Sequence, residues 1–393
     1  MTRPVLDPVD RRALAATAVQ FFVNGAMTAS YVARAPQLRD RIGVGVDTFG
    51  LLLTIAAIFG LLGSLAAGRI VHAATTRRVL QAGAVVMLLS LLLIGAAHQP
   101  LVWLVGMATY MFVDTLVDIS MNLQGSWISS RRHTPVMHRL HGIWSLGTFA
   151  GGLGAVAANA AGLTPFAHLA IVVGVMAVAL SFVSANLLPG DERGHEEPNG
   201  AAAPAPPRRL AVVLLVLAGA FAVVAEVTGG DWSTFRMTDD FGATAALGSA
   251  AFVAYTVGMT TMRFCGDVLQ LRLGRAGLHR VSMALATAGL VMASLVPARA
   301  VALVGFLLVG IGVATFMPKL YDDAARLPGR RGAGLGAMTA GMRVTFLVTP
   351  AAVGALAGTS LSVGAAVALL TLPAVAGLAV VSEWNERLLR LPR

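Results

Sequence analysis

Runs of apolar residues, separated by short polar stretches, recur along almost the whole chain. A membrane-spanning helix needs about 20 predominantly apolar residues to cross the hydrocarbon core, so each run predicts one crossing. The expected crossings cover residues 13–34, 48–71, 79–98, 101–127, 139–161, 165–188, 210–230, 244–265, 279–296, 300–320, 333–357 and 361–382. The pattern therefore predicts an all-α polytopic membrane protein with twelve transmembrane helices.

One long polar stretch separates the first six runs from the last six. It is rich in Pro, Ala and charged residues, a composition typical of a flexible linker. Thr148 in the fifth run and Thr345 in the eleventh, 197 positions apart, each begin a Thr-Phe pair followed by small residues. Such spacing is typical of an internal repeat. We therefore expect a six-helix half, a linker and a second pseudo-symmetric half with a short tail: 1–188, 189–209 and 210–393.

Composition and charge agree with a membrane protein and predict its orientation. The chain is 56% hydrophobic and 12% charged, against about 25% charged residues in a typical soluble domain. If the N-terminus is cytoplasmic, 23 of the 29 Lys and Arg residues lie on the cytoplasmic side and 5 on the opposite side, while Arg343 lies inside a run. This distribution follows the positive-inside rule and predicts that both termini are cytoplasmic.

The sequence contains few residues suited to enzyme chemistry. A single cysteine, Cys265, excludes an internal disulfide, and the histidines lack metal-ligand spacing. Neither a nucleophile–base set nor the phosphate-binding sequence Gly-x-x-x-x-Gly-Lys-Ser/Thr is present. We therefore expect a protein that is not an enzyme and has no catalytic residue, metal site, cofactor or nucleic-acid partner.

Acidic residues inside apolar runs point to function. Asp114 and Asp118 lie four residues apart in the fourth run, Asn122 continues their helical face, and Glu226 lies in the seventh run. A carboxylate at bilayer depth costs about 2.5–3.5 kcal/mol on insertion scales, so such acids usually serve a function inside protein or a water-filled cavity. The three acids are candidate proton carriers. The alternative for Asp114 is a structural ion pair with Arg139 or another cation, and for Glu226 a cavity-facing residue that carries no proton.

Several stretches resemble the major facilitator superfamily. Residues 68–80, GRIVHAATTRRVL, are similar to the superfamily's loop signature Gly-x-Leu-x-Asp-Arg-x-Gly-Arg-Lys, and residues 263–275, RFCGDVLQLRLGR, form a second copy. The matching positions in the first copy are Gly68, Arg77 and Leu80. His72 and Thr75 stand in place of the usual Asp and Gly. The stretches FFVNGAMTASYVARAPQLRDRIG, MNLQGSWI and EVTGGDWSTFRMTDDFG resemble the YbjJ-like branch of bacterial inner-membrane proteins.

The resemblance implies a secondary active transporter that moves a small organic solute by alternating access, as a monomer in the lipid bilayer of a bacterial plasma membrane. Runs 1, 4, 7 and 10 would line the cavity, and its candidate residues are Asn24, Thr28, Tyr31, Tyr110, Asn122 and Arg343. The gating-loop candidates are Gly68, Arg77, Arg78, Gly266, Asp267 and Arg272. Proton coupling is expected; the alternatives are a proton-independent uniporter and a non-transporting sensor or scaffold on the same fold.

Some of these residues have a second interpretation, and others carry expectations about packing. The polar face of the first run is also explained by hydrogen bonds between helices, and Arg343 by a partner inside the protein. Gly147 and Gly151 in the fifth run form a small-residue face that allows close helix approach. Gly68 and Gly266 are expected to open the two basic loops. Arg34, at the outer end of the first run, is expected to extend to interfacial water.

Overall fold

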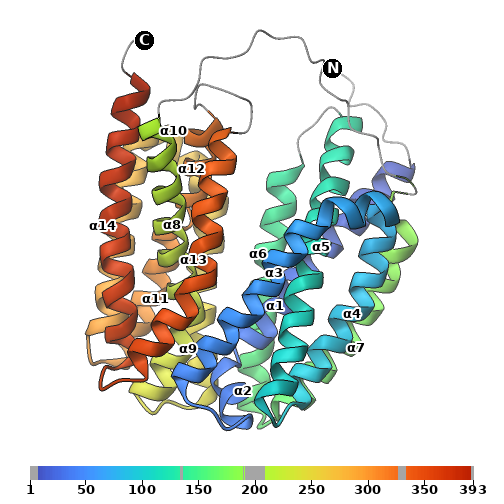
Figure 1. Ribbon diagram of the computed structural model, residues 1–393, viewed down its shortest axis with the longest axis horizontal. Helices are drawn as coiled ribbons and strands as arrows, with labels where there is room; N and C mark the ends of the chain where they lie inside the picture. Colours follow the sequence, from blue (N-terminus) through green and yellow to red (C-terminus); the bar gives the residue numbers. More distant parts are fainter. Residues whose placement is uncertain (1–7, 133–135, 189, 191–208, 326–332, 391–393) are drawn as a thin grey trace. The chain divides into compact units, whose positions relative to one another are not determined.

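The computed structural model describes residues 8–132, 136–188, 190, 209–325 and 333–390, which are helical almost throughout (Figure 1). Within these residues there are fourteen α-helices, α1 to α14, one short π-helix, η1, and no β-strand. The chain divides into two compact units. The first comprises Met1–Gly45 and Ile55–Gly194, and the second Val46–Thr54 and His195–Arg393.

The first unit is built from α1, α2, most of α3, and α4 to α7. Their bounds are α1 Pro8–Val32, α2 Ala35–Arg41, α3 Val46–Ala74, α4 Thr76–Ala96, α5 Pro100–Arg131, α6 Met137–Ala160 and α7 Pro165–Asn186. Both α5 and α7 begin with proline, which suits the first helical position because no N–H is needed there. Thr164 caps α7, since its hydroxyl accepts a hydrogen bond from the backbone N–H of Ala167 at 3.2 Å.

The second unit contains the remaining helices. Their bounds are α8 Arg209–Asp231, α9 Ser233–Phe235, η1 Arg236–Asp240, α10 Ala245–Leu295, α11 Arg299–Val313, α12 Phe316–Ala325, α13 Ala333–Ala357 and α14 Val363–Arg390. The start of α3 groups with this unit because it packs on α13. Thr54 Oγ1 accepts from the backbone N–H of Ala351 at 3.0 Å, and a Cβ on Gly50 would lie 3.0 Å from the Cα of Gly354.

Ten helical segments of the described chain have the length and apolar composition to cross a membrane. They include both parts of α10, Ala245–Gly266 and Val268–Leu295, but not α1 and α6, which are long enough yet less apolar. These two helices carry polar residues that meet inside the first unit, among them Asn24 and Trp144. The predicted runs lie in helices apart from a few residues at their ends, but the run 300–320 is divided between α11 and α12. The prediction of an all-α polytopic protein is confirmed.

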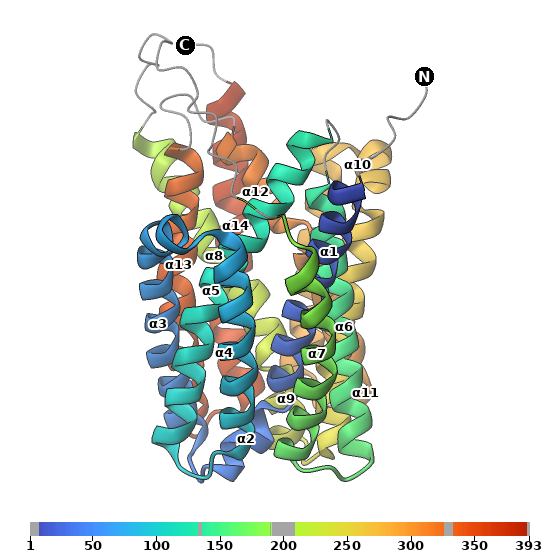
Figure 2. The same ribbon diagram turned by 90° about the vertical axis from the view of Figure 1, so that its right-hand side faces the viewer.

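Helices α1 and α6 lie side by side in the first unit (Figure 2). Their backbones approach closely because a Cβ on Gly147 would overlap the carbonyl oxygen of Phe22, and a Cβ on Gly151 that of Ala26. The predicted small-residue face is therefore confirmed at these two glycines. Close approach matters for function because it brings side chains of α6 within hydrogen-bond distance of α1.

The two basic turns do not begin at the predicted glycines. Helix α3 continues through Gly68 as far as Ala74, and α10 continues through Gly266. A single glycine costs a helix only about 1 kcal/mol relative to alanine, which the surrounding helix-forming residues outweigh. The backbone leaves helical geometry instead at Thr75 and Gly274, where φ is 74° and 69°. The expectation that Gly68 and Gly266 open the loops is thus wrong.

Thr75 is the one non-glycine residue with positive φ in the part of the chain that the structure describes. A β-branched side chain in this region is strained by roughly 1–2 kcal/mol. We expect Thr75→Gly to raise the free energy of unfolding by about 1 kcal/mol, seen as a higher melting temperature of the purified protein in detergent. Gly274→Thr is the matched control at the second turn and should lower the melting temperature. An unchanged or lower melting temperature for Thr75→Gly would show that the backbone of Thr75 is not strained.

Candidate functional site

Helices α1, α5 and α6 bring a set of polar side chains together in the first unit. The amide Nδ2 of Asn24 donates to Oδ1 of Asp114 at 2.6 Å, and the indole Nε1 of Trp144 donates to Oδ1 of Asn24 at 2.9 Å. The hydroxyl oxygens of Thr28 and Tyr110 lie 3.1 Å apart. The four-residue step from Asn24 to Thr28 on α1 thus matches a four-residue step in the reverse direction on α5, as antiparallel helices require.

The indole of Trp144 fixes the orientation of the Asn24 amide. An indole N–H is only a donor, so it must meet the amide oxygen, which leaves the amide NH₂ group to face Asp114. Asn24 is 5% exposed, and the reverse orientation would set donor against donor and acceptor against acceptor in a buried place. Trp144 therefore acts on Asp114 through Asn24. Sequence reasoning missed this residue, because Trp144 carries no charge and no motif.

The two carboxylate oxygens of Asp114 have different surroundings. Oδ1 is held by Asn24. Oδ2 has no hydrogen-bond partner in the described part of the chain, and it is not among the fully buried unpartnered atoms. Within the same residues Asp114 forms no ion pair with Arg139 or another cation. The geometry leaves one oxygen held by a hydrogen bond and the other without a protein partner in the described residues.

The other predicted residues of these two helices lie around the same place. Asp118, one turn from Asp114, is exposed, and Asn122 donates to its backbone carbonyl at 2.8 Å and to its carboxylate Oδ1 at 3.1 Å. The ring of Tyr31 meets that of Tyr110 edge-on, with centroids 5.3 Å apart and an interplanar angle of 77°. The faces of α1 and α5 that the sequence singled out therefore meet within the first unit.

Glu226 has different surroundings, on α8 of the second unit. Nη2 of Arg263 donates to its Oε1 at 3.4 Å, and the hydroxyl of Tyr255 donates to its backbone carbonyl at 2.8 Å. Its second oxygen, Oε2, is buried and has no hydrogen-bond partner in the described part of the chain. A carboxylate with a cationic neighbour and a closed second oxygen is less suited to proton exchange than Asp114. Arg263, the first residue of the second copy of the loop signature, lies inside α10.

The sequence profile of the Major Facilitator Superfamily matches residues 16–328. The chain belongs to this family. The membrane protein MosC of Rhizobium meliloti is 27% identical to it, over 82% of this chain and 77% of MosC. An uncharacterized MFS-type transporter of Yersinia pestis is 26% identical, over 87% of this chain and 86% of that protein.

Solved structures of the superfamily have the same fold. A mutant of the nucleoside transporter NupG superposes with a TM-score of 0.72 at 8% identity, over 96% of this chain and 99% of that chain. A bacterial homolog of the human lysosomal transporter Spinster, in an inward-facing and unoccupied conformation, gives 0.66 at 14% identity, over 98% of each chain. The predicted family and fold are therefore confirmed. The protein is a multi-pass membrane protein of a transporter family.

The predicted gating residues of this superfamily member are spread over helix ends. Arg77 is half-buried on α4, and its Nη2 donates to the backbone carbonyl of Ser184 on α7 at 3.2 Å. Gly266 lies within α10, and the side chain of Asp267 is outside the described residues. The exposed members are Gly68, Arg78 and Arg272, together with the cavity candidate Arg343 on α13.

A buried carboxylate stabilises the second basic turn, the one at Gly274 in α10. Asp323 on α12 is 2% exposed and accepts from Nη2 of Arg275 at 2.5 Å and from Nζ of Lys319 at 2.8 Å. Arg275 directly follows the kink in α10, so its ion pair with Asp323 connects that kink to α12. Sequence reasoning named the nearby Arg272 instead. The four-residue spacing of Lys319 and Asp323 was the available signal.

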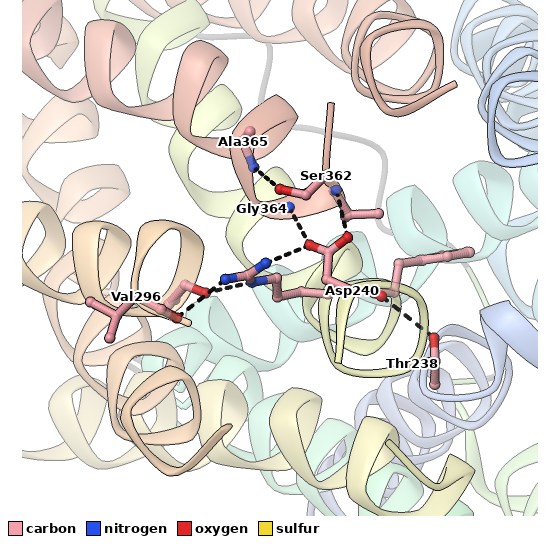
Figure 3. A network of polar contacts seen from close by, with 10 residues as sticks. Thr238, Asp240, Val296, Ser362, Gly364 and Ala365 are labelled. Atoms are coloured by element: carbon pink, nitrogen blue, oxygen red, sulfur yellow. Dashed lines mark hydrogen bonds and ion pairs between the residues drawn. The ribbon is translucent and has the colours of Figure 1, made fainter. Parts of the chain in front are cut away.

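A second buried ion pair joins three segments of the second unit (Figure 3). Nη1 of Arg236 donates to Oδ2 of Asp240 at 2.6 Å, and both side chains are less than 10% exposed. Its Nε and Nη2 donate to two carbonyl oxygens at the end of α10, those of Ala293 and Val296. Asp240 also accepts from the first two backbone N–H groups of α14, those of Val363 and Gly364. The pair thus connects η1 to the end of α10 and the start of α14.

Proposed function

We propose that this protein is a secondary active transporter that moves a small organic solute by alternating access and couples the movement to protons through Asp114. The observation that carries the proposal is the contrast between the two oxygens of Asp114, one held by Asn24 and the other open. A charged carboxylate inside a membrane span costs about 2.5–3.5 kcal/mol on insertion scales. Proton binding at Oδ2 removes that charge. The protonated form therefore favours any conformational state of the protein in which Asp114 is less hydrated.

Coupling also requires that the inward-open and outward-open states bind the proton or the solute unequally. Asp114 lies at the end of a hydrogen-bonded chain that runs through Asn24 to Trp144 and so touches α5, α1 and α6. Loss of its charge weakens a charge-assisted hydrogen bond between helices. This supports a role in which protonation alters how the three helices pack, with Asp118 and Glu226 as secondary candidates.

The solute is proposed to bind along the same faces of α1 and α5. Thr28, Tyr31, Tyr110 and Asn122 offer hydroxyl and amide groups beside aromatic rings, a combination typical of sites for small organic molecules. Arg343, exposed on α13, stays a candidate for an anionic group of the solute. The nucleoside of NupG is not carried over, because that likeness, at 8% identity, concerns the fold.

We also propose a bacterial plasma-membrane location with both termini in the cytoplasm, and a functional monomer in which residues 189–209 link two six-helix halves. The support is the 23-to-5 distribution of Lys and Arg and the bacterial origin of the relatives. Apart from residues 190 and 209, the proposed linker lies outside the described residues. Membership of the YbjJ-like branch stays a prediction from the three resembling stretches.

Reconstitution tests the proposed transport. Solutes are selected by comparing the metabolites of cells with and without the protein, and their uptake is then measured in proteoliposomes under an imposed pH gradient. Coupling of one proton to one solute should give accumulation of up to about tenfold per pH unit, since that gradient is worth about 1.4 kcal/mol. Equilibration without accumulation would indicate the uniporter, and absence of flux for every selected solute would indicate the sensor or scaffold.

A further inference from the structure

A buried arginine lies at the turn between α1 and α2. Arg34 is 2% exposed, so the expectation that it extends to interfacial water is wrong. The backbone determines its place: its N–H donates to the carbonyl of Tyr31 at 3.0 Å, and its carbonyl accepts from the N–H of Leu38 at 3.0 Å. Helix α2 then starts at the next residue, Ala35, with Pro36 in its first turn. The backbone conformation at this turn therefore places the guanidinium of Arg34 in a buried position.

The guanidinium of Arg34 has more donors than partners. Its Nη2 donates to the backbone carbonyl of Leu163, in the connection between α6 and α7, at 2.8 Å. Its Nε and Nη1 are buried, and in the described part of the chain they have no hydrogen-bond partner and no carboxylate nearby to pair with. Burial lowers the pKa of this group to about 10, which still leaves it charged near neutral pH. A buried cation without a counter-charge is strongly unfavourable.

His168 follows Leu163, the residue that binds Arg34, by five positions, and it also lacks partners. It is 4% exposed, and neither ring nitrogen has a hydrogen-bond partner among the described residues. It occupies the first turn of α7, where the helix dipole favours negative charge. A neutral imidazole always carries one N–H donor. Unused donors from two separate elements therefore lie near the start of a long helix, on either side of the connection that binds Arg34.

We propose that Arg34 and His168 form a binding site for a small inorganic anion such as chloride, where the α1–α2 and α6–α7 connections of the first unit meet. The ion would accept from Nε and Nη1 of Arg34 and from the imidazole N–H of His168. A water molecule can accept these hydrogen bonds but leaves the buried charge uncompensated. The near-complete burial of both side chains excludes larger organic anions. The bound anion holds the end of α1 against the start of α7.

Chloride titration of thermal stability tests this site. The purified protein is heated in detergent while chloride replaces gluconate, a bulky organic anion, at constant ionic strength. A ligand that binds only the folded state stabilises it logarithmically with concentration, so the melting temperature should rise by a few degrees for each tenfold increase in chloride above the dissociation constant. Arg34→Gln should remove this dependence. Arg39→Gln, which deletes a nearby cation that already pairs with Asp40 at 2.7 Å, should retain it.

A second variant keeps the test decisive if Arg34→Gln does not fold. His168→Phe leaves the guanidinium in place but removes one donor, and it should shift the chloride midpoint to roughly tenfold higher concentration. The proposal is overturned if the wild-type melting temperature is the same in chloride and gluconate. It is equally overturned if Arg34→Gln responds to chloride as the wild type does, or if His168→Phe leaves the midpoint unchanged.

Discussion

Replacement of Asp114 by asparagine is expected to abolish solute accumulation driven by a pH gradient while solute binding and exchange persist. Asparagine has nearly the volume of the protonated acid and still accepts from Asn24, but it cannot release a proton. The accumulation ratio in proteoliposomes should fall from up to about tenfold per pH unit to about one. Exchange of labelled for unlabelled solute, measured without a gradient, should continue.

Two other variants separate coupling from folding. Asp118→Asn changes the exposed neighbour one turn away and should reduce accumulation far less. Trp144→Phe frees the Asn24 amide to turn, so it should move the pH dependence of accumulation without abolishing it. A purely structural Asp114 predicts little folded protein but normal coupling in what remains. Wild-type accumulation in well-expressed Asp114→Asn would end the proposal and make Glu226 the leading candidate.

Removal of the Asp240 carboxylate should cause the largest loss of stability. Asp240→Ala leaves Arg236 buried without its ion-pair partner and leaves two backbone N–H groups of α14 without their acceptor. Breaking one side of a buried ion pair typically costs about 3–5 kcal/mol, and loss of a helix cap adds about 1 kcal/mol. The yield of monodisperse protein and its melting temperature should both fall sharply.

The neighbouring residues provide matched controls for this ion pair. Asp239→Ala removes an adjacent, exposed carboxylate and should change the melting temperature little. Arg236→Leu combined with Asp240→Ala removes both charges, so it should be more stable than Asp240→Ala alone. If the double variant were no better than the single one, the cap on α14 would be the main contribution. Equal melting temperatures for Asp239→Ala and Asp240→Ala would refute the role of the pair.

Much of the fold follows from interactions between residues that are close in sequence, and these can be predicted from the sequence. A backbone in hydrocarbon must satisfy its own hydrogen bonds, so each long apolar run has to become a helix. The helical period then places Asn24 with Thr28, and Tyr110 with Asp114, on single faces before any packing is known. Those faces were predictable and lie in contact. The turn positions were not, because glycine tolerates a helix and the strained backbone of Thr75 has no local signature.

Tertiary structure alone decided the different surroundings of the two acids, Asp114 and Glu226. In the sequence, Asp114 and Glu226 are both single carboxylates inside apolar runs. Packing pairs Glu226 with Arg263 and closes its second oxygen, whereas it holds Asp114 by one oxygen only. The partners of Asn24 lie 90 and 120 positions away along the chain, on α5 and α6. Local sequence carries no information at such separations, because the free energy of a buried charge depends on neighbours that only helix packing supplies.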